Sequence, residues 1–94
     1  MSQTIERISG TRRARISGNG AGRLHYSGNR VSVEPVEGAT LSGFLTLSVD
    51  GQTPMTLDLA TDRYVGNSVG FDYLDFEVTG LSQGAEFMLV VGGV

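Results

Sequence analysis

The residues that this chain lacks already exclude several classes of protein. Its 94 residues include no cysteine, no tryptophan and no lysine, and only two prolines. Without cysteine, neither a disulfide framework nor a thiolate metal site can add to the stability of the fold. No apolar run approaches the roughly 20 residues that a membrane-spanning helix needs. The first residues also lack the basic and then apolar pattern of a signal peptide, so we expect a protein made in the cytoplasm without a membrane anchor.

The hydrophobic content sets the size of the core. Leucine, isoleucine, valine and phenylalanine supply 26 of the 94 residues, which is above the level at which a chain stays disordered. A chain of this length has room for one core and not for two. Residues 1–94 are therefore expected to form a single domain. Such a domain buries only about 60 to 65% of its unfolded surface, and self-association would add to its stability.

Charge is distributed unevenly along the chain. Residues 1–30 hold six arginines and one glutamate, whereas residues 31–94 hold Arg63 alone with five aspartates and four glutamates. All the positive side chains are guanidinium groups, which form bidentate pairs with carboxylates or phosphates better than ammonium groups do. The basic N-terminal part therefore predicts an anionic partner, and residues 1–22 are a candidate for an extended basic arm.

Period-two alternation of apolar and polar residues is the main secondary-structure signal. The chain has 14 glycines and no apolar stripe at helical spacing, so we expect no helix. The clearest alternation runs through residues 45–59 on both sides of Asp50-Gly51, which predicts a β-hairpin with a tight turn at that pair. Pro54 has no N–H to donate, and we expect it at the start of its strand or at a sheet edge.

Further strands are predicted on both sides of this hairpin. Residues 71–78 alternate, with Leu74, Phe76 and Val78 facing inward. Residues 86–91 are apolar on both faces, which is typical of a strand that is covered on both sides or pressed against another subunit. Shorter strand-like segments are residues 11–16, 23–26, 30–36 and 41–44.

These segments together predict an all-β fold of about seven to eight short antiparallel strands. We expect a β-sandwich, of which a jelly roll is one form. A small barrel stays open as an alternative, because composition does not distinguish the two.

Patterns for catalysis or metal binding are weak. His25 is the only histidine, no Gly-x-Ser-x-Gly elbow accompanies it, and we expect it on the surface or at a strand end. Residues 18–22 lack the helix and the lysine of a phosphate-binding loop. An oxygen-ligated calcium ion at residues 58–62 stays open, although the spacing matches no EF-hand. We interpret the possible carboxylate pairs as solvated acids: Asp72 and Asp75, Asp58 and Asp62, Glu34 and Glu37. The prediction is a non-enzymatic protein with no catalytic residue, no bound metal and no cofactor.

The arginines near the N-terminus are the strongest candidate for a partner-binding site. If residues 11–16 form a strand, Arg13 and Arg15 lie on one face and Arg12 on the other. Nucleic acid is disfavoured, because aromatic residues do not alternate with the arginines as they do in proteins that stack on bases. An acidic protein surface is the expected partner, and ordinary solubilising charge is the alternative. The proposed partner-binding residues are Arg7, Arg12, Arg13 and Arg15, with Arg23 and Arg30 further along the chain.

The end of the chain completes a recognisable set of features. A cysteine-free, lysine-free and glycine-rich chain with a basic N-terminal segment ends in Phe87-Met88-Leu89-Val90-Val91-Gly92-Gly93-Val94. In this general character it resembles the small all-β structural proteins of tailed bacteriophages. The resemblance implies a capsid decoration, cement or tail-associated protein in the virion, which forms homo-oligomers, with a trimer favoured, and attaches to a capsid or tail protein. The expected oligomer interface is Phe87, Met88, Leu89, Val90 and Val91.

A second hypothesis is a carbohydrate-binding or adhesin-like module on the same kind of sandwich. It would use Tyr26, Tyr64 and Tyr73 to stack on sugar rings. Three tyrosines and no tryptophan offer little aromatic surface for this purpose, so the structural protein is our first hypothesis.

Overall fold

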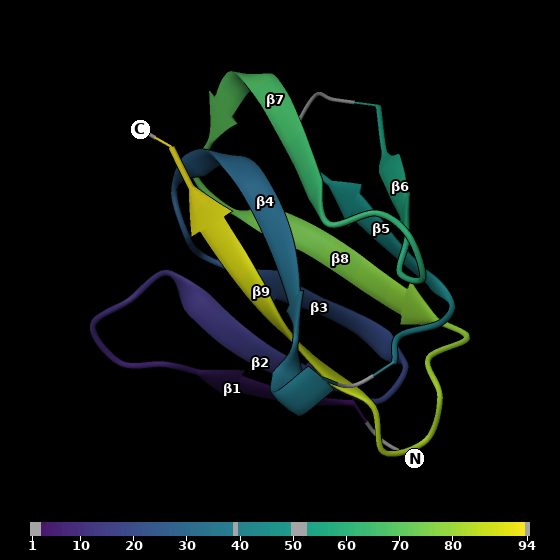
Figure 1. The fold of residues 1–94 in the computed structure, drawn as a ribbon. Coiled ribbons are helices and arrows are strands. Elements are labelled where there is room, and N and C mark those ends of the chain that lie inside the picture. The colour runs from purple at the N-terminus through teal and green to yellow at the C-terminus, as the bar shows by residue number, and fades with distance from the viewer. Residues whose placement is uncertain (1–2, 39, 50–52, 94) are drawn as a thin grey trace.

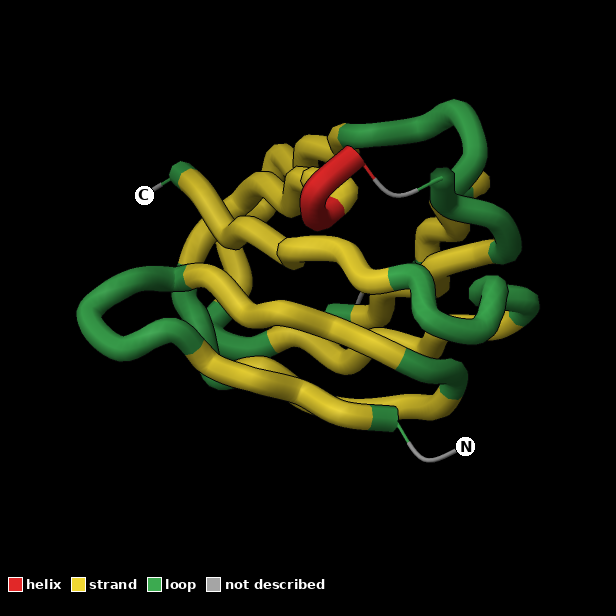
Figure 2. The backbone as a smooth tube through the Cα atoms, turned by 60° about the horizontal axis from the view of Figure 1, so that its bottom comes forward, coloured by secondary structure: helices red, strands yellow, loops and turns green. Residues whose placement is uncertain are grey.

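Two antiparallel β-sheets pack face to face in the computed structural model, which describes residues 3–38, 40–49 and 53–93 (Figures 1 and 2). The first sheet has five strands in the order β1-β2-β9-β4-β7, and the second has four in the order β3-β8-β5-β6. The prediction of an all-β sandwich is therefore confirmed. The strands are β1 (Thr4–Arg7), β2 (Arg13–Ser17), β3 (Gly20–Leu24), β4 (Gly28–Pro35), β5 (Phe44–Ser48), β6 (Met55–Asp58), β7 (Tyr64–Phe71), β8 (Leu74–Thr79) and β9 (Glu86–Gly92), and a short 3-10 turn, η1, covers Val36–Gly38.

The strand connections follow the jelly-roll pattern. Four antiparallel pairs nest within one another: β2 with β9, β3 with β8, β4 with β7, and β5 with β6. Successive pairs alternate between the two sheets, which is the arrangement of a double-sheet jelly roll. Strand β1 is an addition to this set, and it pairs with β2 at the edge of the five-stranded sheet.

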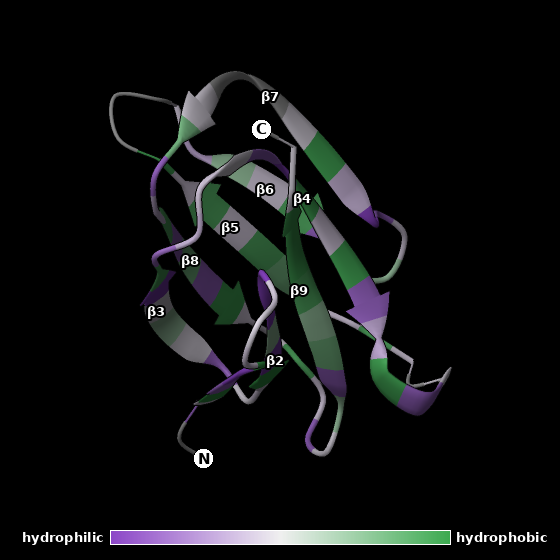
Figure 3. Ribbon diagram, turned by 90° about the vertical axis from the view of Figure 1, so that its left-hand side faces the viewer, coloured by the Kyte–Doolittle hydropathy of each residue, from purple (hydrophilic) through white to green (hydrophobic). Residues whose placement is uncertain are grey.

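The core lies between the sheets and is built from alternate residues of the strands. In β9, the side chains of Phe87, Leu89 and Val91 are buried, with at most 2% exposure. Strand β9 is hydrophobic along most of its length and lies in the middle of its sheet, between β2 and β4 (Figure 3). It is therefore a central strand, but it is covered by the second sheet on one face only, because alternate residues of β9 stay partly exposed. Strand β8 also buries the three side chains that its alternation predicted, Leu74, Phe76 and Val78.

The predicted hairpin over residues 45–59 is formed by β5 and β6. Leu45 lies opposite Leu57 and Leu47 opposite Met55. The Asp50-Gly51 turn lies outside the described residues. Pro54 directly precedes β6, which is an edge strand, so its expected position is confirmed.

Two strands escaped the sequence analysis, and two predicted segments are shifted, one of them residues 23–26, where β3 instead covers Gly20–Leu24. Strand β7 contains glycines, and its pairing with β4 slips between Gly28 and Arg30, so its apolar residues do not alternate regularly. Strand β1 is short and mostly exposed. Residues 41–44 were expected to form a strand, but β5 begins only at Phe44.

The N-terminal part does not extend from the domain as an arm. Strands β1 and β2 and the beginning of β3 fall within residues 1–22, and all three belong to the sheets. Strand β2 pairs with β9 along its whole length. The expectation of an arm is corrected for the described residues, because β1 and β2 pair within the five-stranded sheet and β3 pairs within the four-stranded sheet.

Candidate functional site: the outer face of the five-stranded sheet

The outer face of the five-stranded sheet brings together several residues that were predicted separately. Arg13 lies opposite Val90 and Arg15 opposite Met88. Ala14, between the two arginines, is buried, so Arg13 and Arg15 point away from the core on one face, as predicted. We define the outer face by the following residues of β1, β2, β4, β7 and β9: Glu6, Arg13, Arg15, Arg30, Ser32, Glu34, Tyr64, Gly66, Glu86, Met88, Val90 and Gly92.

Only part of the predicted oligomer interface lies on this face. Met88 and Val90 are half-buried and point outward from β9, whereas Phe87, Leu89 and Val91 are buried in the core. Successive side chains of a strand point to opposite sides, so an uninterrupted apolar run supplies both surfaces of the sheet. The interface assignment is therefore corrected for Phe87, Leu89 and Val91, which a second subunit cannot reach in the folded domain.

The ion pairs on the outer face are long and exposed. Arg13 Nη1 lies 3.4 Å from Glu34 Oε1, Arg15 Nη1 lies 3.8 Å from Glu86 Oε1, and Arg15 Nε lies 4.0 Å from Glu6 Oε1. Strong charge-assisted hydrogen bonds are nearer 2.7–2.9 Å, and exposed pairs contribute roughly 0–1 kcal/mol to stability. Arg15 Nε is also shielded from solvent and donates no hydrogen bond to a described residue. These arginines are therefore held only weakly by the glutamates of their own chain.

The side chains of Arg30 and Tyr64 lie next to one another, over Gly66 and Gly92. A Cβ atom built on Gly92 would lie 3.8 Å from both Nε and Nη2 of Arg30, and one built on Gly66 would lie 3.0 Å from Tyr64 Oη and 4.0 Å from Arg30 Cγ. Tyr64 is 57% exposed. Within residues 3–38, 40–49 and 53–93, Arg30 forms no ion pair. Arg30 and Tyr64 thus offer N–H and O–H donors, and no carboxylate among the described residues forms an ion pair with Arg30.

Sequence analysis did not connect Arg30 with Tyr64, because their contact depends on the pairing of β4 with β7. The relevant signal was the presence of Gly66 and Gly92, two strand residues without side chains. A glycine inside a strand often marks a place where another group approaches closely.

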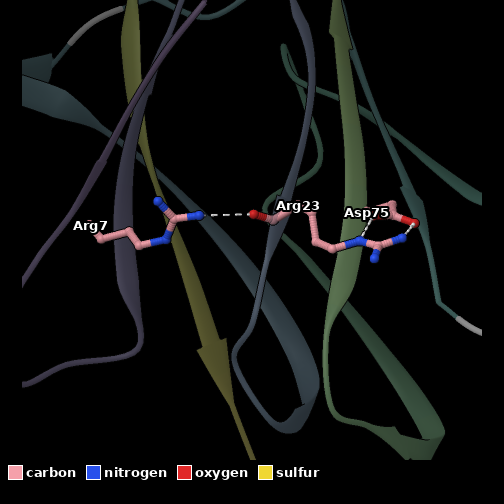
Figure 4. Close-up of polar contacts among 3 residues, drawn as sticks. All are labelled: Arg7, Arg23 and Asp75. Carbon is pink, nitrogen blue, oxygen red and sulfur yellow. Dashed lines mark hydrogen bonds and ion pairs between the residues drawn. The ribbon is translucent and has the colours of Figure 1, made fainter.

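The other two predicted arginines bind backbone carbonyls of their own chain. Arg12 donates from Nη1 to Ser27 O at 2.7 Å and from Nη2 to Gly93 O at 3.3 Å. Arg7 donates from Nη2 to Arg23 O at 3.1 Å (Figure 4). The structure therefore separates the predicted cluster, with Arg13 and Arg15 on the outer face and Arg7 and Arg12 holding neighbouring segments.

A different arrangement surrounds Arg23 on the four-stranded sheet. Arg23 donates from Nε to Asp75 Oδ1 at 2.6 Å and from Nη2 to Asp75 Oδ2 at 3.1 Å (Figure 4). Its guanidinium carbon lies 4.4 Å from the centre of the Tyr73 ring. The hydrogen bond from Arg23 is the main cause that lowers the pKa of Asp75. Both carboxylate oxygens are occupied, so Asp75 is a poor candidate for a general base.

The remaining candidates for chemistry have structural roles. His25 is exposed just after β3, as expected, with its ring centre 6.1 Å from that of Tyr73. Asp62 Oδ2 accepts a hydrogen bond from the Asp58 N–H at 2.9 Å, and Asp58 Oδ1 accepts one from the Ala60 N–H at 3.0 Å. These two carboxylates organise the turn after β6. The part of the chain that the structure describes contains no group of three histidine or acidic side chains that could hold a metal ion.

The three tyrosines do not form one platform for a sugar ring. Tyr26 packs against the core and donates to Arg13 O at 3.1 Å. The Tyr73 ring is covered by Arg23, and Tyr64 lies on the outer face of the other sheet. An aromatic stacking site needs exposed rings on a common surface, so these positions do not favour the carbohydrate hypothesis.

A pocket of about 400 Å³ opens between the β2–β3 turn and the β8–β9 connection. Asn19, Ser82 and Gln83 contribute to its polar lining, and Glu86 is its one charged side chain. The Asn19 amide is already used, because it accepts from Leu81 N at 2.8 Å and donates to Leu81 O at 3.3 Å. Asn19 therefore serves the fold at this pocket, and no arginine among the described residues lines it.

Comparisons of the chain with models of protein families, with curated proteins and with solved structures gave no match. No helix among the described residues has the length and apolar character to cross a membrane.

Proposed function

We propose that this protein is a non-enzymatic structural protein that attaches to an acidic protein surface through the outer face of its five-stranded sheet. The observation that carries this proposal is the grouping of Arg13, Arg15 and Arg30 with Met88 and Tyr64 on one face. Arginine, tyrosine and methionine are the residues most enriched where proteins bind each other.

The shape of the face and the loose pairing of its arginines agree with a protein partner, although the face as defined has three arginines and three glutamates. A sheet face is broad, so it suits another broad surface better than a small substrate, which binds in a concave site. Its arginines are paired loosely, at 3.4 to 4.0 Å, and Arg30 adds a donor with no acidic partner among the described residues. Incoming carboxylates would gain hydrogen bonds without breaking strong internal ones.

The setting that we propose is a virion, in which the protein is a homo-oligomeric decoration, cement or tail-associated component. Jelly rolls are frequent in viral capsid proteins, although they also occur in lectins. A fold by itself does not determine function, so the proposal depends on the outer face. Met88 and Val90 are the apolar residues available there for contact with another protein.

Binding to a model acidic polymer tests the docking face. The probe is an immobilised random copolymer of glutamate and tyrosine, and binding is measured by biolayer interferometry. We expect the wild-type protein to bind at about 50 mM salt and to dissociate at about 500 mM, because salt screens exposed charges. The Arg13→Ser/Arg30→Ser variant should bind about tenfold or more weakly, since interface arginines commonly contribute more than 1 kcal/mol.

The control removes the same charge from other surfaces. Arg23→Ser/Arg63→Ser has the same net charge as the test variant and leaves the outer face intact, so it should bind like the wild-type protein. Equal binding by the two double variants would contradict the docking face. Tighter binding to duplex DNA than to the copolymer, at the same salt concentration, would overturn the choice of an acidic protein as partner.

A further inference from the structure

Strand β1 stands outside the set of strands that makes the jelly roll. Strands β2 to β9 form both sheets and all four nested pairs without it. Three of the four β1 residues are exposed, and only Ile5 packs against the core. Strand β1 is therefore an accessory strand, whose removal from its place would leave the core arrangement intact.

Strand β1 nevertheless fits a specific groove. It pairs with β2 by backbone hydrogen bonds, and alternate side chains reach across to β3. Gln3 Nε2 donates to Gly20 O at 3.0 Å, and Arg7 Nη2 donates to Arg23 O at 3.1 Å. Between them, Ile5 Cδ1 lies only 2.6 Å from the position that a Cβ of Gly22 would take. The absent side chain at Gly22 thus forms the notch that receives Ile5.

The turn that joins β1 to β2 is bonded to distant parts of the chain at Arg12, its last residue. It projects beyond both sheets as a loop (Figures 1 and 2). Its first residues have local hydrogen bonds, from the Thr11 N–H to Ile8 O at 3.2 Å and from the Ile8 N–H to Arg13 O at 3.0 Å, whereas its last residue, Arg12, is bonded to Ser27, Val91 and Gly93. Gly10 has a φ of +77°, and a Cβ placed on it would meet nothing within 4 Å. Residues 8–11 could therefore straighten while Arg12 keeps its bonds to Ser27, Val91 and Gly93.

The register of the hairpin permits the same pairing between two molecules. Thr4 lies opposite Ser17, and Arg7 lies opposite Ala14. If the turn straightens, residues 4–17 of one copy can run antiparallel to residues 17–4 of another. The same residue pairs then form between the two copies. The copies are related by a two-fold axis that passes between the straightened turns, as in other closed symmetric dimers. The β1 side chains would meet the same groove, now on the other copy.

From these features we infer that β1 exchanges between two copies of this chain, and that the β1 of each copy occupies the β2–β3 groove of the other. This inference rests on the homo-oligomeric part of the proposed function and specifies its contact. It leads to a dimer, whereas the sequence analysis favoured a trimer. The contacts of β1 are the same in both forms, so the conformation of the turn sets the balance between them.

Gly10→Val is the decisive variant. Valine is strongly disfavoured at positive φ, and the open space around Gly10 excludes a steric clash. The substitution should therefore destabilise the closed turn and leave the straightened one unaffected. We expect the substitution to shift the equilibrium of each turn from closed to straight by roughly tenfold. Two turns straighten when a dimer forms, so the dimer association constant should rise about a hundredfold. Sedimentation equilibrium over a range of protein concentrations measures it.

Gly84→Val is the matched control. Gly84 lies in the β8–β9 connection with a φ of +84°, and its Cβ position also has nothing within 4 Å. The same local strain is thus introduced at a turn that does not join β1 to β2. The dimer association constant of this variant should equal that of the wild-type protein. If Gly84→Val dimerised as strongly as Gly10→Val, the inference that β1 is exchanged would be wrong.

Cysteine crosslinking identifies the strand that is exchanged. The chain has no cysteine of its own, so Thr4→Cys/Ser17→Cys places one pair of thiols across β1 and β2. In the Gly10→Val background, oxidation should give covalent dimers well above the level of the single-cysteine variants. Exclusively intramolecular crosslinks at high protein concentration would overturn the inference. Binding to the acidic copolymer is measured separately, so the exchange and the docking face can fail independently.

Discussion

The arginine side chains of this protein have three different environments. Arg7 and Arg12 donate to backbone carbonyls, Arg23 forms a bidentate pair with Asp75, and Arg13 has a single long contact with Glu34. Guanidinium groups are equally charged in all three, but their freedom to bind a partner differs. At the scale of the residue, the quality of the internal contact separates structural arginines from candidates for docking.

The Arg23–Asp75 pair predicts a specific dependence of stability on acid. The pKa of Asp75 is lowered in the folded state, chiefly by the hydrogen bond from Arg23. The ionised carboxylate therefore stabilises the fold above its unfolded pKa, close to 3.8, and this contribution is lost as the pH falls through the lower folded value. Asp75→Asn should be less stable than the wild-type protein at pH 7, and the difference should shrink as the pH falls through the lowered pKa of Asp75.

Urea denaturation at several pH values measures this effect. Asp72→Asn is the control, because Asp72 is exposed and belongs to none of the ion pairs among the described residues. A gap between Asp75→Asn and the wild-type protein that stays constant with pH would show that the carboxylate charge of Asp75 is not what stabilises the pair.

At the scale of the element, β9 contributes side chains both to the core and to the outer face. Its buried residues complete the core, and its outward residues Met88 and Val90 form the centre of the outer face. The apolar character of residues 86–91 was evident in the sequence. Division of that run between core and surface follows only from the position of β9 between β2 and β4.

Alanine substitutions along β9 should separate its two faces. Leu89→Ala leaves a cavity in the core, and we expect it to lower the free energy of unfolding by about 2–5 kcal/mol. Val90→Ala changes a half-buried surface residue and should cost less than about 1 kcal/mol. Urea denaturation of the two variants at neutral pH measures both values. Similar losses for the two would mean that the inner and outer faces of β9 are assigned incorrectly.

At the scale of the whole molecule, the jelly roll joins distant parts of the chain. Arg13 of β2 pairs with Val90 of β9, and Gly20 of β3 pairs with Val78 of β8. Such pairs form only after long loops have closed, which slows folding. We expect refolding in milliseconds to seconds, measured by stopped-flow circular dichroism. Complete refolding within microseconds would be inconsistent with a transition state that contains these distant pairs.

The sequence by itself determined the class of the fold and the faces of its clearest strands. Alternation with a period of two is a local property, so it assigned Leu74, Phe76 and Val78 to the core and placed Arg13 and Arg15 together. Only the tertiary structure decided which strands are neighbours. Strand pairing depends on residues far apart in the chain, and it alone placed Arg30 beside Tyr64, gave Arg7 and Arg12 to backbone carbonyls, and turned the N-terminal residues into an edge strand held by the Gly22 notch.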